Sequence, residues 1–378
     1  MYSRLIQAPK DKSFFLFGPR GTGKTTWVKT NFKNALYLDL LEAELFNDLL
    51  ANPQRLENLI PKQFSDWVII DEIQRIPDLL NEVHRLIEKY KYKFILTGSS
   101  ARKLKRKGPN LLAGRALTYS LYPLTALELG NDFDLNHALS YGALPSVYIE
   151  ENPKKYLESY AKTYLEEEIQ QEGLTRNLGG FSRFLEAASF SQGSVLNISK
   201  VAEDCSIERK VVENYFTILE DLLIGCRIPV FTKRAKRRLS AHPKFYYFDT
   251  GLYRTLRPMG LLDIPEEAEG HAVETLLFQE LRAINDYFNL GYTIYYWRTS
   301  NGMEIDFVLY GQKGIKAFEI KRTRKINRSM FRGLKAFLRD YPSAKTYFIY
   351  GGERREREGD IEILPMTDTL KNISSILS

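Results

Sequence analysis

Short apolar runs separated by helical segments dominate the first third of the chain. Each run ends at a turn or in polar residues, and the runs span Ser13–Phe17, Trp67–Ile70 and Lys93–Leu96. Continuous apolar runs of this length are typical of strands that are buried on both faces. Strands that alternate with helices in this way predict an α/β domain with an open parallel sheet and a ligand at the carboxyl edge of that sheet.

The pattern changes after the turn at Tyr141–Pro145. A helical segment, Lys154–Gln171, is followed by two helices around a short turn, at Ile198–Ala202 and Glu208–Ile224. The next segment, Cys226–Asp249, alternates like two strands around a basic tip. Helix, turn, helix and hairpin in this order predict a winged helix, a domain type that binds DNA in some proteins and other proteins elsewhere.

A glycine-rich turn follows the first predicted strand. It reads Gly18-Pro19-Arg20-Gly21-Thr22-Gly23-Lys24-Thr25, continues into a helix from Thr26, and fits GxxxxGK[ST] in a strand, loop, helix setting. The backbone N–H groups of such a loop surround phosphates at the positive end of the helix dipole. Lys24 would reach the β- and γ-phosphates, and the Thr25 hydroxyl would bind Mg²⁺. The loop therefore predicts ATP and Mg²⁺ as cofactors, with residues 18–26 contacting the nucleotide.

Polar residues at the next two strand ends complete this predicted site. Asp71 would hold Mg²⁺ through water, and Glu72 would polarise the attacking water. At the third strand end, Thr97 or Ser99 would lie near the γ-phosphate and sense whether it is present. We therefore expect Asp71 and Thr97 among the nucleotide contacts and Glu72 as a catalytic residue.

Hydrolysis also needs a positive charge on the transition state, which an arginine supplies in cis or in trans. Our candidate is Arg115, and Arg20 in the loop and Arg102 after the third strand are alternatives. For each of the three arginines, the alternative is a surface charge without a catalytic role. A role in trans would require a homo-oligomer.

Four segments carry a family resemblance. FFLFGPRGTGKTT, VIIDEIQRIP, FILTGSS and LLAGRALTYSLYPLTALEL, in this order and spacing, resemble the bacterial and archaeal AAA-type ATPases that have a C-terminal domain of unknown function numbered 4143. The resemblance covers the first third closely and the region after Tyr156 more loosely. It implies an ASCE-type P-loop fold with Glu72 as catalytic glutamate, and it names no substrate.

A second set of charged residues lies near the C-terminus. Glu274 falls on a helical run, Ala272–Asn285, Asp306 on a strand, and Glu319 and Lys321 on the following strand. Glu319 and Lys321 point to one face because side chains alternate along a strand, so both can meet Asp306 across a hairpin.

Asp306 followed by Glu-x-Lys resembles the PD-(D/E)XK nucleases and implies a restriction-endonuclease-like α/β fold. Glu274, Asp306 and Glu319 would bind Mg²⁺, and Lys321 would orient or activate water for attack on a phosphodiester. Glu304 is an alternative ligand. The sequence leaves open whether the site cleaves or only grips DNA.

These patterns predict four domains in an α/β protein. They are a P-loop domain of AAA type at 1–130, a helical lid or linker at 131–190, a winged helix at 191–262 and a nuclease-like domain at 263–378. The length of 378 residues, at roughly 150 per domain, gives two to three domains and so makes a single fold unlikely, and 44% hydrophobic with 27% charged residues excludes long disorder. No apolar stretch approaches the ~20 residues of a membrane span, so we expect no membrane partner. The lack of a signal-type N-terminus and the presence of only two cysteines, Cys205 and Cys226, fit a cytoplasmic protein.

The net charge of +7 is concentrated in the C-terminal half. Basic residues gather between Gly225 and Gly260 and again at Lys321–Arg332. We expect DNA as the partner, contacted by Lys233–Arg238 and Lys321–Arg328.

The predicted function is ATP hydrolysis by an AAA-type protein that couples nucleotide state to DNA binding or processing. The alternatives are a remodeller of branched or duplex DNA that does not cleave, and a signalling or scaffold NTPase with a protein partner.

Overall fold

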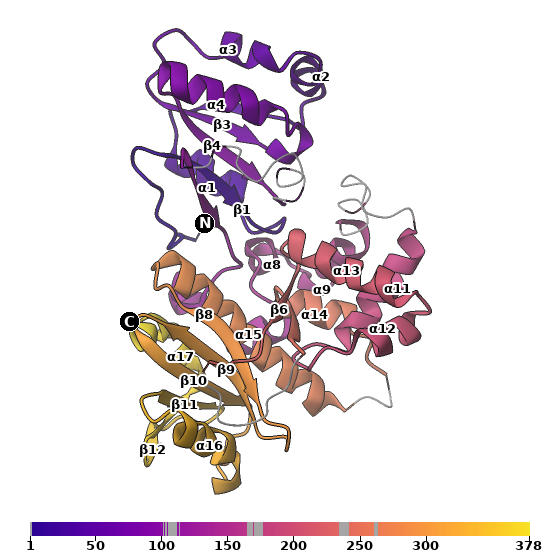
Figure 1. The fold of residues 1–378 in the computed structure, drawn as a ribbon, viewed down its shortest axis with the longest axis vertical. Helices are drawn as coiled ribbons and strands as arrows, with labels where there is room; N and C mark the ends of the chain where they lie inside the picture. The colour runs from indigo at the N-terminus through magenta and orange to yellow at the C-terminus, as the bar shows by residue number, and fades with distance from the viewer. Residues whose placement is uncertain are drawn as a thin grey trace. The chain divides into compact units, whose positions relative to one another are not determined.

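A computed structural model describes residues 2–100, 102, 104, 112, 114–164, 169, 177–233, 242–260 and 264–378 (Figure 1). The chain divides into two compact units. The N-terminal unit comprises Arg4–Tyr122 with Asp221–Leu223, and the C-terminal unit comprises Pro123–Glu220 and Ile224–Ser378 together with the first residues of the chain. Within the described ranges, no helix has both the length and the apolarity needed to cross a bilayer.

The N-terminal unit is built on a parallel sheet of five strands in the order β2-β3-β4-β1-β5. Its strands are β1 (Ser13–Phe17), β2 (Leu36–Asp39), β3 (Trp67–Asp71), β4 (Lys93–Gly98) and β5 (Ala116–Ser120). The register places Phe17 opposite Gly98 on one side and Ser120 on the other. The strands that precede the glycine-rich turn, the acids and the hydroxyl residues therefore end at one edge, and the predicted α/β fold with a parallel sheet is confirmed.

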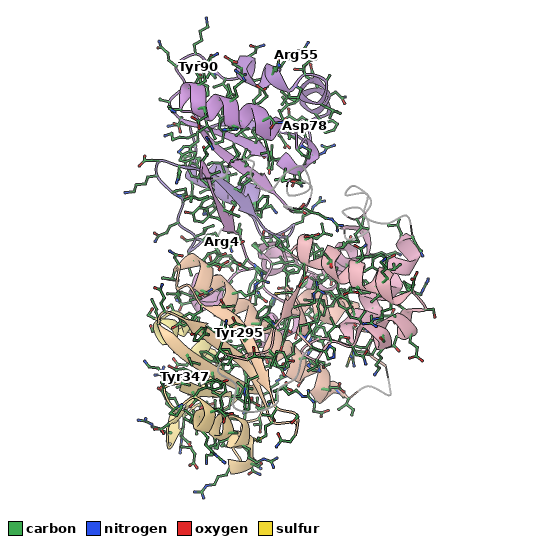
Figure 2. All side chains as sticks on the ribbon, in the orientation of Figure 1. Arg4, Arg55, Asp78, Tyr90, Tyr295 and Tyr347 are labelled. Atoms are coloured by element: carbon green, nitrogen blue, oxygen red, sulfur yellow. The ribbon has the colours of Figure 1, made fainter. Side chains whose placement is uncertain are left out.

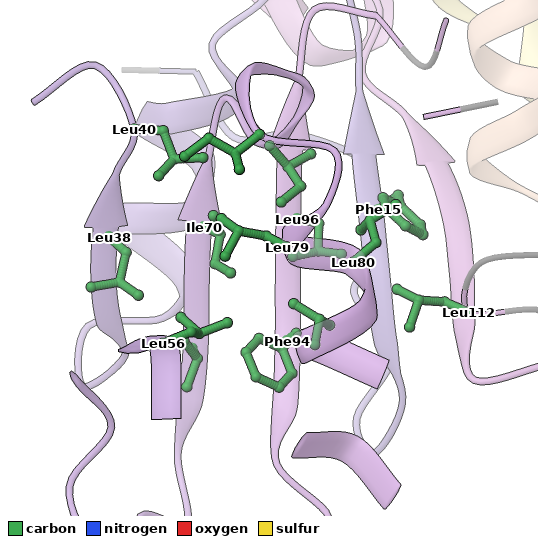
Figure 3. Close-up of a cluster of buried hydrophobic side chains, with 14 of the residues drawn as sticks. Phe15, Leu38, Leu40, Leu56, Ile70, Leu79, Leu80, Phe94, Leu96 and Leu112 are labelled. Carbon is green, nitrogen blue, oxygen red and sulfur yellow. The ribbon is translucent and has the colours of Figure 1, made fainter. Parts of the chain in front are cut away.

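Helices pack on both faces of this sheet, which explains why its central strands are apolar throughout. The helices are α1 (Lys24–Asn31), α2 (Ala43–Ala51), α3 (Leu56–Leu59) and α4 (Leu79–Tyr90). Leu79 and Leu80 of α4 pack on one face with Phe15, Ile70 and other strand residues (Figure 3). On the opposite face, Phe14 meets Trp27 of α1 with ring centroids 6.4 Å apart.

The C-terminal unit begins with helices and a small antiparallel sheet. The helices are α6 (Ala126–Leu129), α7 (Leu135–Tyr141), α8 (Pro145–Ile149), α9 (Pro153–Ser159), α11 (Leu178–Ser189), α12 (Ile198–Cys205), α13 (Arg209–Asp221) and α14 (Thr250–Leu256). After α9 the chain makes a π-helical turn at Tyr160–Tyr164, so the predicted helix over 154–171 is not a single α-helix, and most of its second half lies outside the described residues. Strands β6 (Gly225–Ile228) and β7 (Lys244–Tyr247) form the hairpin that the sequence predicts. Residues 234–241 of its basic tip lie outside the described part of the chain.

A mixed sheet of six strands forms the rest of this unit. It follows α15 (Pro265–Tyr287) and has the order β12-β13-β11-β10-β9-β8. Its strands and helices are β8 (Thr293–Arg298), β9 (Glu304–Gly311), β10 (Gly314–Lys321), α16 (Arg332–Asp340), β11 (Lys345–Tyr350), β12 (Glu356–Glu358), β13 (Ile361–Pro365), α17 (Met366–Lys371) and α18 (Ile373–Leu377). Strands β9 and β10 pair antiparallel, as predicted, whereas β10 and β11 are parallel.

Helices cover both faces of the mixed sheet as well. On one face, Phe337 of α16 packs with Trp297, and Tyr295 lies beside this cluster. On the other, the ring of Phe278 on α15 stacks on Phe307 of β9. Figure 2 labels Tyr295 and also Tyr347, whose ring stacks on Phe318. The sheet is thus buried between α15 and α16, and charged residues on its central strands require partners.

Candidate functional site

The glycine-rich turn forms a compact loop between β1 and α1. Gly21 and Gly23 have φ values of 82° and 88°, a left-handed conformation that glycine adopts without strain. A side chain at Gly18 would place its Cβ 2.3 Å from the carbonyl oxygen of Leu121. No side chain caps the N-terminus of α1, and an anion bound there would accept from its first N–H groups.

Lys24 is buried within this loop. Its Nζ donates to the carbonyl oxygens of Gly18 at 2.6 Å and Pro19 at 3.1 Å. The loop is braced from outside by Arg4, labelled in Figure 2, whose guanidinium donates to the carbonyl oxygens of Thr22 at 2.7 Å and Tyr122 at 2.6 Å. The ammonium therefore lies among the backbone groups that would surround a phosphate.

Asp71 is the centre of the hydrogen-bond network at the carboxyl edge. Its carboxylate accepts from the hydroxyl of Thr25 at 2.8 Å and from the hydroxyls of Tyr37 and Thr97. Burial and the bond to Asp71 raise the pKa of Tyr37, so this phenol stays a donor. Thr97, which we expect near the γ-phosphate, donates to Asp71 in this structure. Three hydroxyls from α1, β2 and β4 thus hold this carboxylate before any metal arrives.

Glu72 follows in an unusual backbone conformation. Its φ of 59° and ψ of 43° are left-handed, which costs a non-glycine residue energy and is often found at functional sites. Gln74 donates through Nε2 both to the Glu72 carboxylate and, at 3.2 Å, to the Ser99 hydroxyl. The side chain of Glu72 is therefore held toward the end of β4, where Ser99 lies.

The three candidate arginines lie in different places. Arg115 immediately precedes β5, whose first residue, Ala116, pairs with Ser13 at the start of β1. It therefore lies at the amino edge of the sheet, where its guanidinium pairs with Glu88. The strand between this edge and the loop spans five residues, roughly 16 Å, which exceeds the reach of an arginine side chain. The structure excludes a role for Arg115 in cis.

The two alternatives lie nearer the loop. Arg20 is an exposed residue of the loop itself. Arg102 follows β4 at the carboxyl edge, is buried, and lies 3.4 Å from the carboxylate of Asp221. Arg102 is therefore placed at the edge of the sheet where hydrolysis would occur.

The predicted residues of the C-terminal unit converge on one cluster. Lys321 Nζ lies 2.9 Å from Glu319 and 3.9 Å from Asp306, so β9 and β10 bring these three side chains together. Asp306 also accepts from the backbone N–H of Ile320 at 2.9 Å. Glu274 reaches the cluster from α15 and accepts from the Tyr246 hydroxyl at 2.9 Å.

A second lysine, which the sequence did not suggest, enters the same cluster from β7. The ammonium of Lys244 lies 3.7 Å from Glu274 and 4.0 Å from Asp306, and it pairs with Glu304. Glu304 is also bound by Arg298 at 3.0 Å. Among the described residues, no three or more acidic, histidine or cysteine side chains are arranged to hold a metal ion. As the side chains lie, this donor set does not fit Mg²⁺.

Burial governs the protonation of the cluster. It raises the pKa of Glu274 and of Glu319, and the neighbouring Asp306 raises both further. Burial alone would lower the pKa of Lys244, but Glu274, Asp306 and Glu304 together raise it above its usual range. Asp306 is likewise the main cause of a raised pKa at Lys321. Both lysines therefore remain charged throughout the physiological pH range.

The basic residues predicted to contact DNA are only partly described. Of Lys233–Arg238, Lys233 is exposed and the others lie outside the described residues. In the second cluster, Lys321 is engaged with carboxylates and Arg322 pairs with Glu269. The rest of that cluster, Arg324, Lys325 and Arg328, is exposed.

Comparison with known families agrees with this geometry. Residues 10–130 match the family described as AAA domain, and residues 269–369 match the domain of unknown function DUF4143. The N-terminal unit carries an AAA-type P-loop domain. The family resemblance predicted from the sequence is confirmed. Between the two matches, residues 132–264 match the domain of unknown function DUF8612.

Three curated relatives extend over much of the chain. Two uncharacterized proteins, from Mycobacterium bovis and Mycobacterium tuberculosis, are each 26% identical over 96% of this chain and 81% of their own length. An uncharacterized protein of Haemophilus influenzae is 23% identical and covers 62% of both chains. In the two mycobacterial relatives, the similarity therefore extends over both the AAA domain and the region after it.

Two solved structures show weaker similarity. One is the Aeropyrum pernix ORC1 protein in complex with DNA, with a TM-score of 0.26, 14% identity, and coverage of 66% of this chain and 87% of that chain. The other is a Vibrio cholerae protein with a TM-score of 0.24, 12% identity, and coverage of 91% and 97%. At TM-scores this low, neither likeness bears on function.

Sequence reasoning missed several residues around the AAA site and the carboxylate cluster. Tyr37 and Gln74 contact Asp71 and Glu72, yet a tyrosine in a strand and a glutamine in a turn carry no distinctive signal. Lys244 did carry one, because it is the only charged residue at the start of the otherwise aromatic run Phe245–Phe248. A buried strand that begins with a lysine requires an anionic partner elsewhere in the fold.

Proposed function

We propose that this protein is an ATP hydrolase whose nucleotide state controls its binding to DNA. The observation that carries the proposal is the hydrogen bond between Thr25 and Asp71, 2.8 Å long. It joins the residue after the loop lysine to the acid at the end of β3. These are the two groups that a P-loop site brings to its metal ion.

The residues present fit ATP with Mg²⁺. The loop from Gly18 to Thr25 would receive the phosphates on its N–H groups, and Lys24 would exchange its carbonyl partners for phosphate oxygens. Thr25 and Asp71 would hold Mg²⁺, and the ion would supply positive charge to offset the negative charge of the phosphates. Glu72, held by Gln74, would accept a hydrogen bond from the attacking water and orient it. We assign the arginine role to Arg115 of a neighbouring copy.

The C-terminal unit supports the DNA part of the proposal. Helices α11, α12 and α13 are followed by the β6–β7 hairpin, and Gln192 and Val195 add bridges to β7. This order is that of a winged helix. Beside the acidic Glu213, the exposed side of α13 presents four polar or basic residues, Arg209, Lys210, Asn214 and Thr217. These are donors of the kind that contact phosphates and base edges in a groove.

The test measures ATP turnover and DNA binding in the same samples. Wild type should hydrolyse ATP faster with DNA, and this stimulation should fade as salt rises, because phosphate contacts weaken with ionic strength. Lys24→Ala should abolish nucleotide binding, and Arg209→Glu with Lys210→Glu should lower DNA affinity about uniformly across sequences. Lys313→Glu, an exposed charge reversal on the β9–β10 turn, is the matched control. If DNA does not change the rate of ATP hydrolysis and the protein does not bind DNA, the proposed control of DNA binding by nucleotide is contradicted. That result would favour the alternative function, a signalling or scaffold NTPase with a protein partner.

One observation favours the alternative in which the protein grips DNA without cutting it. Cleavage by a PD-(D/E)XK site needs a divalent ion between carboxylates, and here the ammonium of Lys244, which is not part of the Glu-x-Lys pattern, lies among those carboxylates. A gel assay of the same DNAs with Mg²⁺ and Mn²⁺ tests this point. Cleavage that disappears in Lys321→Ala would contradict the non-cutting alternative.

A further inference from the structure

We infer that Lys244 is the resident cation of the carboxylate cluster in the C-terminal unit. Its ammonium occupies the position in which a nuclease-like site would hold a divalent ion, and the native chain takes up no divalent ion there. This inference concerns metal binding alone and does not depend on ATP hydrolysis or on DNA binding.

The contacts of the ammonium support this assignment. Lys244 Nζ pairs with Glu304 and lies within 4.0 Å of both Glu274 and Asp306. These carboxylates come from β9 and α15, the elements that supply two of the three predicted metal ligands. One positive centre surrounded by carboxylates from two elements is the arrangement that a bound cation would show.

The side chain of Lys244 cannot move away from the carboxylates that surround its ammonium. The residue is 1% exposed, and its backbone is fixed because β7 pairs with Ile228 on β6 and with Val195. Its Nζ also lies 5.7 Å from the ring centroid of the buried Tyr296. A buried ammonium must remain with its carboxylates, since leaving them would place an unpaired charge in the core.

Lys321 differs from Lys244 in this respect. Its side chain is 42% exposed, so it can turn outward and leave Asp306 and Glu319 to another cation. Lys321 is the lysine that the Glu-x-Lys pattern contains, whereas Lys244 is additional. A divalent ion placed among these carboxylates would lie beside the Lys244 ammonium, and repulsion between like charges would oppose its binding.

The inference is tested with Mn²⁺ on the nucleotide-free full chain, using the electron paramagnetic resonance signal of unbound Mn²⁺ to count bound ions. Four proteins are compared: wild type, Asp306→Asn, Lys244→Met, and the double variant. Asp306→Asn keeps an oxygen acceptor for the Ile320 N–H and removes the charge. We expect wild type and Asp306→Asn to bind the same amount of Mn²⁺. Lys244→Met should bind about one further Mn²⁺ per chain, and the double variant should lose it.

Two results would overturn the inference. Mn²⁺ bound by wild type but not by Asp306→Asn would show that the native cluster accepts a divalent ion beside Lys244. A folded Lys244→Met protein that binds no more Mn²⁺ than wild type would show that the lysine does not occupy the ion's position. Circular dichroism establishes whether Lys244→Met is folded. If it is not, the comparison of wild type with Asp306→Asn decides alone.

Discussion

Thr25 and Asp71 lie 46 positions apart in the sequence, and the hydroxyl of the first donates to the carboxylate of the second across 2.8 Å. The same carboxylate accepts from Tyr37 and Thr97. The carboxylate that we propose as a Mg²⁺ ligand is therefore held by three protein hydroxyls and by the backbone N–H of Glu72, which donates to it at 3.1 Å. Nucleotide would arrive at a carboxylate whose position is already fixed.

Replacing Thr25 separates the role of its hydroxyl from that of its backbone. Thr25→Ala should weaken Mg²⁺-dependent nucleotide binding roughly 10- to 100-fold, because a hydrogen bond to a charged group contributes about 1.5–3 kcal/mol. Thr25→Ser keeps the hydroxyl and should bind like wild type. Titration of a fluorescent ATP analogue with and without Mg²⁺ measures both. Equal Mg²⁺ dependence in Thr25→Ala and wild type would remove this hydroxyl from the metal site.

Glu72 should act on turnover and not on binding. Glu72→Gln removes the charge that would orient the attacking water but keeps a hydrogen-bonding side chain beside Gln74. We expect ATP affinity to be unchanged and the steady-state rate to fall roughly 10²- to 10⁴-fold, the range for loss of a general base. Glu44→Gln, a change at an exposed residue of α2, is the control. A Glu72→Gln rate equal to that of wild type would end the assignment of a catalytic role.

The position of Arg115 makes its proposed role depend on a second copy. Arg115→Ala should bind ATP with the affinity of wild type, since the residue lies at the opposite edge of the sheet from the loop. Its turnover should be low, and adding Lys24→Ala chains should restore activity, because each chain supplies the group that the other lacks. ATPase assays of the two variants, alone and mixed, measure this. Wild-type turnover by Arg115→Ala alone would rule out the role.

Asp249 gives a pH dependence of stability. The residue is fully buried, and burial raises its pKa to about 6, although N–H groups of Ala143, Gly251 and Leu252 oppose the shift. Because the folded pKa exceeds the unfolded value of 3.8, the stabilisation is complete below pH 4 and is lost as pH rises through 6. Two units correspond to roughly 3 kcal/mol.

Urea unfolding at pH 4 and pH 7 measures this effect. The difference in unfolding free energy between wild type and Asp249→Asn should change between the two pH values by the predicted amount, since asparagine does not titrate. A difference that stays constant would show that the pKa of the Asp249 carboxyl is the same in the folded and the unfolded protein.

The sequence predicted those strands that combine a clear apolar or alternating pattern with functional residues at or near their ends. Strands β1, β3 and β4 end in the residues that mark the nucleotide site, and the alternation along β9 and β10 placed Glu319 and Lys321 beside Asp306. Strand β5 carried no such mark. Its amphipathic run, Ala116–Ser120, gave no indication that it pairs with β1 in parallel, and so the edge at which Arg115 lies could not be known.

Contacts between segments that are distant along the chain could not be predicted from the sequence either. Lys244 contributes to the basic stretch between Gly225 and Gly260, but it is buried among the carboxylates of α15 and β9. Its partners lie 30 or more positions downstream, and only the pairing of β7 in space brings them together. Charge totals along a sequence do not distinguish a surface lysine from one that neutralises a buried acid.

The lysine of β7 also has a consequence for how this chain can vary. Residues 132–264 and 269–369 match separate families, which invites the view that the two segments are exchangeable modules. The ammonium belongs to the first segment and its carboxylates to the second. A recombination event between them would leave a buried charge without its partner on each side of the joint. Selection should therefore keep the two segments together, and a change at position 244 should be tolerated only with compensating changes at 274, 304 or 306.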